Sequence, residues 1–242
     1  MDDCPSSGYV IEHEGTRVWV DAGTGTFAQL QRWIDHIDID AIVITHVHSD
    51  HCLDLFPLYY ARRFDPRIRD MPLYCPERTL EHLSPLLISD STCTLDMMFD
   101  FHEVGEDDDV ELGGMHFSFM RTQHPIPTNA VRAETKDQVL TFSSDSGPDA
   151  ALDDFASGSD AFLCEATYQN DCIGAPLHLS AAQAADFAKR AAARALILTH
   201  IFPGLDPVKS VDEAKATAGD VAVHRAYTGG LFDIEGAGWL DA

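Results

Sequence analysis

The strongest constraint on the fold is a group of histidines and aspartates that directly follows an apolar run. The run AIVIT at 41–45 has the short, branched character of a buried strand, and LDLFPLYYARRF at 53–64 has the pattern of an amphipathic helix. A loop at the carboxyl end of a strand is where α/β proteins place chemistry. Between the two segments, in the order H-x-H-x-D-H, lie His46, His48, Asp50 and His51.

The spacing of these four side chains favours metal binding over an ordinary polar surface loop. His46 and His48 are two positions apart and can point the same way, while Val47 points back to the core. Asp50 and His51 then turn toward a neighbouring position. So short a loop cannot easily give four ligands to one metal ion, but it can serve two adjacent ions. A polar loop that is histidine-rich by chance has no reason to separate a core strand from a core helix.

Three further apolar runs end in a residue that can bind metal. FSFMRTQH ends at His124, VLTFSSD ends at Asp145, and ALILTH ends at His200. Singly, each residue would more often cap a strand or orient a ligand. Together with the first loop they form a consistent set of imidazole and carboxylate ligands, which suits zinc and related first-row metals.

The remaining pattern predicts one α/β domain over residues 1–242. The chain shows strand-like runs first, then helical patterns, and then strands and helices again. This order favours a two-sheet sandwich with outer helices over an alternating parallel sheet. The best-defined helix begins at Ser180, because Gln183 completes a capping-box spacing.

DAGTGTFA at 21–28 matches a dinucleotide-binding fingerprint. A tight turn explains its glycines equally well, and a histidine cluster follows instead of an acidic ribose-binding strand end.

Composition limits the partners of the chain. The sequence has 40 Asp and Glu against 16 Lys and Arg, a net charge of −24, which argues against long nucleic acids and anionic membranes as partners. The acidity favours a solvation adaptation over an acidic partner surface. No apolar stretch is long enough for a membrane span, and the first residues lack the basic and apolar regions of a signal peptide, so we expect neither feature. The six cysteines lack disulfide-framework spacing. We therefore expect a cytoplasmic protein with reduced thiols, and we expect Cys52 to pack in the core rather than bind metal.

The set of motifs resembles the metallo-β-lactamase superfamily over nearly the whole chain. The resemblance implies an αββα sandwich with a dinuclear centre, in which zinc is the expected metal and manganese or iron are alternatives. One ion would be held by His46, His48 and His124, and the other by Asp50, His51 and His200. Asp145 would bridge the two.

Two further motifs, FLCEAT and LHLSAAQAADFA, contribute Glu165 and His178 and resemble the ribonuclease Z-like phosphodiesterase branch. The alternative for Glu165 is a buried carboxylate with a structural role, and the alternative for His178 is a residue that merely adjoins a helix cap. In that branch a Glu–His pair assists proton transfer to the leaving group, so the candidate catalytic residues are Asp50, Glu165 and His178. The overall combination looks closest to the atypical class II cyclic-nucleotide phosphodiesterases.

These motifs lead us to expect hydrolysis of a small anionic phosphodiester by a hydroxide that bridges the two metals. The alternatives are a nuclease that matures RNA 3′ ends, a lactam, thioester or lactone hydrolase, and a non-catalytic metal-stabilised scaffold. The chain has no counterpart of the basic arm with which ribonuclease Z grips transfer RNA. It also starts just before the SSGYVIE region, so the usual first edge strand is expected to be missing or to lie upstream of this start. Relatives are often dimers, which makes a homodimer a candidate assembly.

Overall fold

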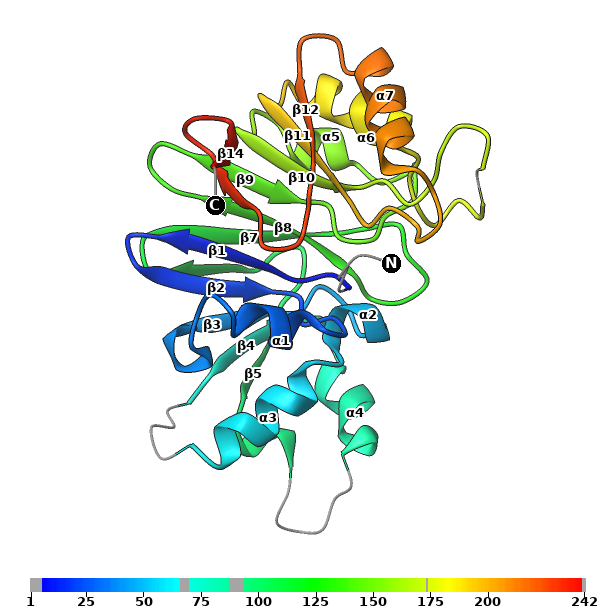
Figure 1. Ribbon diagram of the computed structural model, residues 1–242. Helices are drawn as coiled ribbons and strands as arrows, with labels where there is room; N and C mark the ends of the chain where they lie inside the picture. The colour runs from blue at the N-terminus through cyan, green and yellow to red at the C-terminus, as the bar shows by residue number, and fades with distance from the viewer. Residues whose placement is uncertain (1–5, 66–69, 88–93, 173, 241–242) are drawn as a thin grey trace. The chain divides into compact units, whose positions relative to one another are not determined.

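The computed structural model describes residues 6–65, 70–87, 94–172 and 174–240, which form two compact units (Figure 1). The first unit takes the chain up to Gly105 together with Leu112–Gly114. The second takes Glu106–Glu111 and the chain from Met115 onward. Each unit contains its own sheet and its own hydrophobic core. No helix within the described ranges is both long enough and apolar enough to cross a membrane.

The sheet of the first unit has five strands in sequence order, and both faces of its central strands are buried. Successive residues Val18, Trp19 and Val20 are all inaccessible to solvent, as expected for strands covered on both sides. The first two strands pair antiparallel, and the other neighbours pair parallel. The strands are β1 (Tyr9–His13), β2 (Thr16–Val20), β3 (Ala41–Val43), β4 (Pro72–Cys75) and β5 (Asp100–Glu103).

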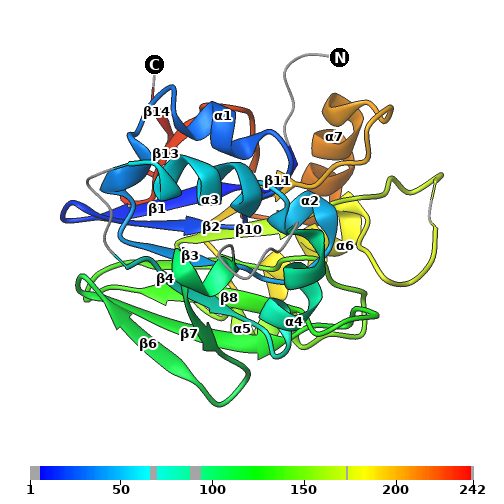
Figure 2. The same ribbon diagram turned by 90° about the horizontal axis from the view of Figure 1, so that it is seen from below.

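Four short α-helices belong to this unit, and its core lies between them and the sheet. Leu55, Leu58 and Tyr59 recur at helical spacing and are fully buried in one cluster with Trp19 and Ile42 of the strands. Figure 2 shows two of the helices, α1 and α3, on the same side of the sheet. The helices are α1 (Thr26–Leu30), α2 (Ser49–Cys52), α3 (Leu55–Arg63) and α4 (Thr79–Leu83), and the 3-10 turns are His36–Asp38, Ser84–Leu86 and Leu95–Met97.

The sheet of the second unit has seven strands in the order β12-β11-β10-β9-β8-β7-β6. Strands β9 to β12 run parallel to one another, and β8 pairs antiparallel with both β7 and β9. A separate hairpin of two strands lies near the end of the chain. The bounds are β6 (Asp109–Leu112), β7 (Met115–Arg121), β8 (Asn129–Glu134), β9 (Val139–Phe142), β10 (Ala161–Glu165), β11 (Ala195–Thr199), β12 (Ala222–Arg225), β13 (Leu231–Asp233) and β14 (Gly238–Leu240).

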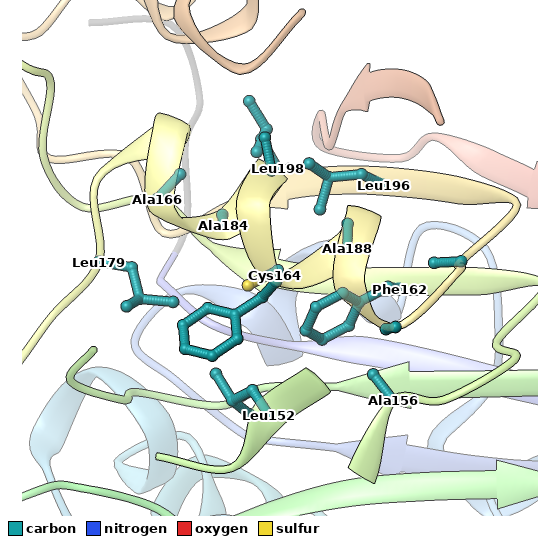
Figure 3. Close-up of a cluster of buried hydrophobic side chains, with 14 of the residues drawn as sticks. Leu152, Ala156, Phe162, Cys164, Ala166, Leu179, Ala184, Ala188, Leu196 and Leu198 are labelled. Carbon is teal, nitrogen blue, oxygen red and sulfur yellow. The ribbon is translucent and has the colours of Figure 1, made fainter. Parts of the chain in front are cut away.

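Three helices, α5 (Leu152–Phe155), α6 (Ala181–Arg190) and α7 (Pro207–Thr217), complete the second unit. Helix α6 buries small side chains against the sheet, and Ala184 and Ala188 belong to the same buried cluster as Phe162 of β10 (Figure 3). The predicted capping box at the start of α6 is confirmed, because Ser180 accepts from the Gln183 N–H and Gln183 in turn accepts from the Ser180 N–H.

Several elements differ from those expected from the sequence. The acidic segment before Met115 gave no strand prediction, yet it contains β6, which adds an edge to the sheet beside β7. Strand β8 and helix α7 were not predicted. Helix α7 carried a readable signal, since the Asp206 side chain accepts from the Val208 N–H and Pro207 occupies the first turn.

Candidate metal centre

The first group of candidate ligands follows β3 in the first unit and leads directly into α2. The stretch was expected to be a loop, but Ser49–Cys52 forms a helical turn in which the His51 N–H donates to the His48 carbonyl at 3.0 Å. His48 is in extended conformation just before this turn. The turn brings Asp50 and His51 back toward His46, whose ring centroid lies 4.0 Å from that of His51.

Two ring nitrogens of this group lie at a separation compatible with a shared metal ion. Nε2 of His46 lies 3.0 Å from Nδ1 of His48. Two ligands of a tetrahedral zinc ion with Zn–N bonds of about 2.0–2.1 Å are separated by roughly 3.3 Å. Nε2 of His51 lies 3.8 Å from a carboxylate oxygen of Asp50. His46 and His51 are fully buried, whereas His48 and Asp50 reach solvent.

Asp21, which the sequence analysis missed, orients this group from the end of β2. Its carboxylate is fully buried and accepts from Nδ1–H of His51 at 2.6 Å and from the Ser7 hydroxyl at 2.8 Å. It also accepts from the N–H and the hydroxyl of Thr45, at 2.9 and 2.8 Å. The available signal was an aspartate that closes an apolar strand, in the stretch VDAG.

The glycine at position 23 allows the backbone of the ligand segment to approach β2. A Cβ at Gly23 would lie 1.9 Å from the carbonyl oxygen of Asp50, and the neighbouring Ala22 N–H donates to the His51 carbonyl at 2.7 Å. The glycine of this fingerprint-like stretch is thus needed for packing within the unit. A dinucleotide site is not required to explain it.

Cys52 packs in the core, as predicted. It is buried in the hydrophobic cluster of the first unit, and its thiol donates to the His48 carbonyl at 3.2 Å. Burial, assisted by the charges of Asp21 and Asp50, raises the pKa of Cys52 to about 12. The thiol therefore stays protonated near neutral pH.

The second group of candidate ligands lies in the second unit, where β9, β10 and β11 are parallel neighbours. Parallel strands end at the same edge of a sheet, so Asp145, Glu165 and His200 are brought together although they are far apart in sequence. The backbone turns sharply there, because Ser144 and His200 have positive φ values of 51° and 53°. Such strained conformations cluster at functional sites.

Asp145 lies between two of the histidines in this unit. One of its carboxylate oxygens is 3.9 Å from Nε2 of His124, and the other is 3.5 Å from Nε2 of His200. Nδ1 of His124 faces the Leu177 carbonyl at 3.4 Å, which favours an Nε2 without a proton. The carboxylate therefore faces His124 with one oxygen and His200 with the other.

Glu165 forms the centre of a second cluster in the same unit. It is fully buried and accepts from Nδ1–H of His178 at 3.0 Å and from the Thr167 hydroxyl at 2.7 Å. The backbone N–H groups of Ser146 and Leu179 donate to it at 2.7 and 3.1 Å. Four donors leave the carboxylate fully satisfied and fix its orientation.

The pairing with Glu165 favours the charged form of His178. Burial lowers the pKa of His178, but the hydrogen bond to Glu165 and the charges of Glu165 and Asp145 outweigh it, so the pKa is raised. The ring stacks on that of His200, with centroids 5.6 Å apart and an interplanar angle of 16°. His178 is placed beside the candidate ligands with its Nε2 able to carry a proton.

The residues of both groups fit divalent first-row metals. All donors are imidazole nitrogens or carboxylate oxygens, and the ligand atoms of Asp145, His178 and His200 lie within 4.8 Å of one another. Hydrogen bonds from Nδ1 to a carboxylate, hydroxyl or carbonyl are the usual way in which metal-binding histidines are oriented. The structure thus brings the first four predicted ligands together in one unit, and the other three in the second unit beside Glu165 and His178.

Imidazole and carboxylate groups at the carboxyl ends of strands make up a candidate divalent-metal site of the kind that metal-dependent hydrolases use. Residues 16–201 match the family described as "Beta-lactamase superfamily domain". The chain therefore belongs to this family, as the motifs had indicated.

Comparisons with individual proteins agree with this assignment. The chain is 33% identical to "Uncharacterized protein Rv1339" of Mycobacterium tuberculosis, covering 98% of this chain and 88% of that protein. It is 25% identical to "Ribonuclease Z" of Clostridioides difficile, covering 83% of each. The crystal structure of the metallo-β-lactamase fold protein YhfI from Bacillus subtilis superposes with a TM-score of 0.85 at 23% identity, covering 95% of this chain and 91% of that one. The fold is that of the metallo-β-lactamases.

Proposed function

We propose that this hydrolase cleaves a small phosphodiester, and that the substrate is a 3′,5′-cyclic nucleotide. The observation that carries the proposal is the Glu165–His178 pair, with 3.0 Å between Nδ1 of His178 and the carboxylate. Expulsion of an alkoxide from a phosphodiester requires a proton, whereas opening of a lactam, thioester or lactone over the same metals does not need this pair. The choice of a cyclic nucleotide rests on the resemblance in sequence.

We further propose that the two groups of ligands act together as one dinuclear centre in a single hydrolase domain. One ion would be held by His46, His48 and His124, the other by Asp50, His51 and His200, and Asp145 would bridge them. Membership of the family and the orientation of His46, His51 and His200 through Nδ1 support this assignment. Zinc is the proposed metal, with manganese and iron as alternatives. Two such ions supply the Lewis acidity that activates water and neutralises a phosphoryl oxygen.

The side chains of the chain have separate tasks in this reaction. Asp50 is half-exposed and orients the attacking water as well as binding metal. His178 donates the proton to the departing oxygen from Nε2, and Glu165 holds the ring through Nδ1. Glu165 is therefore a positioning residue, since it is fully buried and acts through His178.

Charge restricts the length of the substrate. Two divalent ions reverse the local field of an acidic protein, so a small anion can enter. Every phosphate beyond the centre would instead meet a chain whose net charge is −24. A long nucleic acid is accordingly a poor substrate in this proposal.

The proposal is tested by substituting His178 and comparing two substrates. His178→Ala should keep both metals and lower turnover of a cyclic nucleotide by about 10²–10⁴-fold, the usual contribution of a positioned acid. The loss should shrink for a nitrophenyl phosphodiester, because nitrophenolate hardly needs a proton. Glu165→Gln should give a weaker version of the same pattern. Metal content is measured for each variant.

A matched control is His116→Ala. Nδ1 of His116 also pairs with a glutamate, Glu111, at 2.8 Å, but on an exposed hairpin between β6 and β7. This variant should leave both reactions unchanged. Equal losses on the two substrates in His178→Ala would show that His178 is not the acid and would remove the argument for phosphodiester chemistry.

Maturation of RNA 3′ ends is the second candidate, because a relative that matches most of the chain carries the name ribonuclease Z. The test compares a short phosphodiester with precursor transfer RNA at low ionic strength, where the Debye length is about 30 Å at 0.01 M. Repulsion between the carboxylates of the protein and the phosphates of the RNA is then least screened, and we expect the short substrate to be cleaved far better than the RNA. Efficient cleavage of the RNA under these conditions would put the nuclease first.

A further inference from the structure

The same hydrogen-bond arrangement occurs once in each unit, with a threonine at its centre. In the first unit the hydroxyl of Thr45 lies 2.8 Å from a carboxylate oxygen of Asp21 and 3.2 Å from Nδ1 of His46. In the second unit the hydroxyl of Thr167 lies 2.7 Å from a carboxylate oxygen of Glu165 and 2.9 Å from Nδ1 of His200.

The proton count of a hydroxyl determines the direction of these bonds. A hydroxyl has one proton, and in both units it is donated to the carboxylate, which can only accept. The second contact of each threonine then requires Nδ1–H of the histidine to donate to the hydroxyl oxygen. A neutral imidazole with its proton on Nδ1 presents the lone pair of Nε2, which is the form that binds a metal.

We infer that Thr45 and Thr167 are positioning residues that set the tautomers of His46 and His200 for metal binding. This inference rests on the proposed function only in taking the two histidines as ligands. Thr45 itself is fully buried and Thr167 nearly so, and each lies beside a buried carboxylate. A threonine in each unit thus prepares one ligand before the ion arrives.

Each carboxylate consequently orients two histidines by two different routes. Asp21 accepts directly from His51 and reaches His46 through Thr45. Glu165 does the same in the second unit, directly for His178 and through Thr167 for His200. Loss of a carboxylate should therefore disturb two imidazoles, whereas loss of a threonine hydroxyl should disturb only one. This difference separates the relay from a general structural role.

The test uses valine, which keeps the shape of threonine and removes the hydroxyl. In the metal-free full-length protein, ¹⁵N NMR of the histidine rings reports which nitrogen carries the proton. Thr45→Val should move the His46 proton between Nδ1 and Nε2, and Thr167→Val should do so for His200 alone. Signals are assigned by their loss in His46→Gln and His200→Gln. Serine at either position should restore the wild-type tautomer, because it returns the hydroxyl.

Zinc affinity, measured by competition with a chelator, provides the second readout. Loss of a partner that orients a ligand typically costs about 10–100-fold in metal affinity. We expect each valine variant to lower the affinity for one of the two zinc ions by that factor, and each serine variant to restore that affinity.

Two buried threonines that contact no candidate ligand serve as controls. The Thr79 hydroxyl donates to the Pro76 carbonyl at 2.7 Å, and the Thr141 hydroxyl pairs with that of Ser159 at 2.7 Å. Their valine variants should lower stability without altering tautomers or zinc affinity. Unchanged tautomers in Thr45→Val and Thr167→Val, or failure of serine to restore them, would overturn the inference. Because neither readout uses a substrate, a wild-type chain inactive on phosphodiesters would refute the proposed function alone.

Discussion

The first unit takes its candidate ligands from one short segment, His46–His51, whereas the second gathers them from strand ends far apart along the chain. In the first unit, a single helical turn and a buried aspartate fix the geometry. In the second, the parallel pairing of β9, β10 and β11 does so. A local motif therefore depends on a few backbone contacts, while a dispersed one depends on the register of a sheet.

The largest effect is expected from the residue on which the dispersed group depends most. Asp145→Ala removes the carboxylate that faces both His124 and His200, at 3.9 and 3.5 Å. Metal uptake and hydrolysis should both be abolished, a loss well beyond the roughly 10–100-fold typical of a partner that only orients a ligand. His46→Ala should abolish them as well, if the two groups serve one centre. Metal analysis and turnover measure both effects, and Asp137→Ala on an exposed turn is the control. Normal metal content in Asp145→Ala or His46→Ala would show that the two groups of ligands are not both required for metal uptake.

An intermediate effect is expected where the local motif depends on close backbone approach. Gly23→Ala places a Cβ 1.9 Å from the Asp50 carbonyl, so the ligand segment must shift. Overpacking of this kind costs about 1–3 kcal/mol of unfolding free energy, and zinc affinity should fall with it. Gly158→Ala in the second unit is the control, since nothing lies near its Cβ, although its positive φ of 68° adds strain. Denaturant unfolding and zinc competition measure the two quantities. Unaltered zinc affinity in Gly23→Ala would show that the segment tolerates the shift.

The smallest effect concerns how helices begin in the two units. None of the helices α1 to α4 has a hydrogen bond from an N-cap side chain. The side chains at two of these N-cap positions make other contacts: His48 before α2 faces His46, and Asp54 before α3 accepts from the Phe27 N–H at 2.7 Å. In the second unit Ser180 does cap α6. Ser180→Ala should cost about 0.5–2 kcal/mol, measured by denaturant unfolding, and Ser180→Asp should retain most of the stability. Equal stability of all three proteins would mean that packing alone holds α6.

The sequence predicted the local group more completely than its surroundings. The H-x-H-x-D-H spacing pointed to four candidate ligands that the structure brings together in the first unit. The apolar runs that end at His124, Asp145 and His200 pointed to three more, which lie together in the second unit. The family was recognisable because these motifs are short and carry their own chemistry.

What could not be predicted depends on contacts between distant segments. Asp21 lies in a glycine-rich stretch that did not single it out as a functional residue. Its role in orienting His51 follows only from the pairing of β2 with β3, which brings it to Thr45 and His51. Thr167 gained a role because β10 and β11 end side by side. Strand β8 lacks a strong periodic pattern and depends on tertiary packing, whereas helix α7 was signalled only by its start at Asp206 and Pro207.

The central claim is that the two groups of ligands form one dinuclear hydrolytic centre. The most direct test is native mass spectrometry of the full chain during stepwise refilling of the metal-free protein with zinc, with turnover of a cyclic nucleotide followed in the same samples. We predict two ions per chain, with activity that rises only as the second ion binds. Binding of a single ion at saturation, or full activity with one ion or none, would contradict the account.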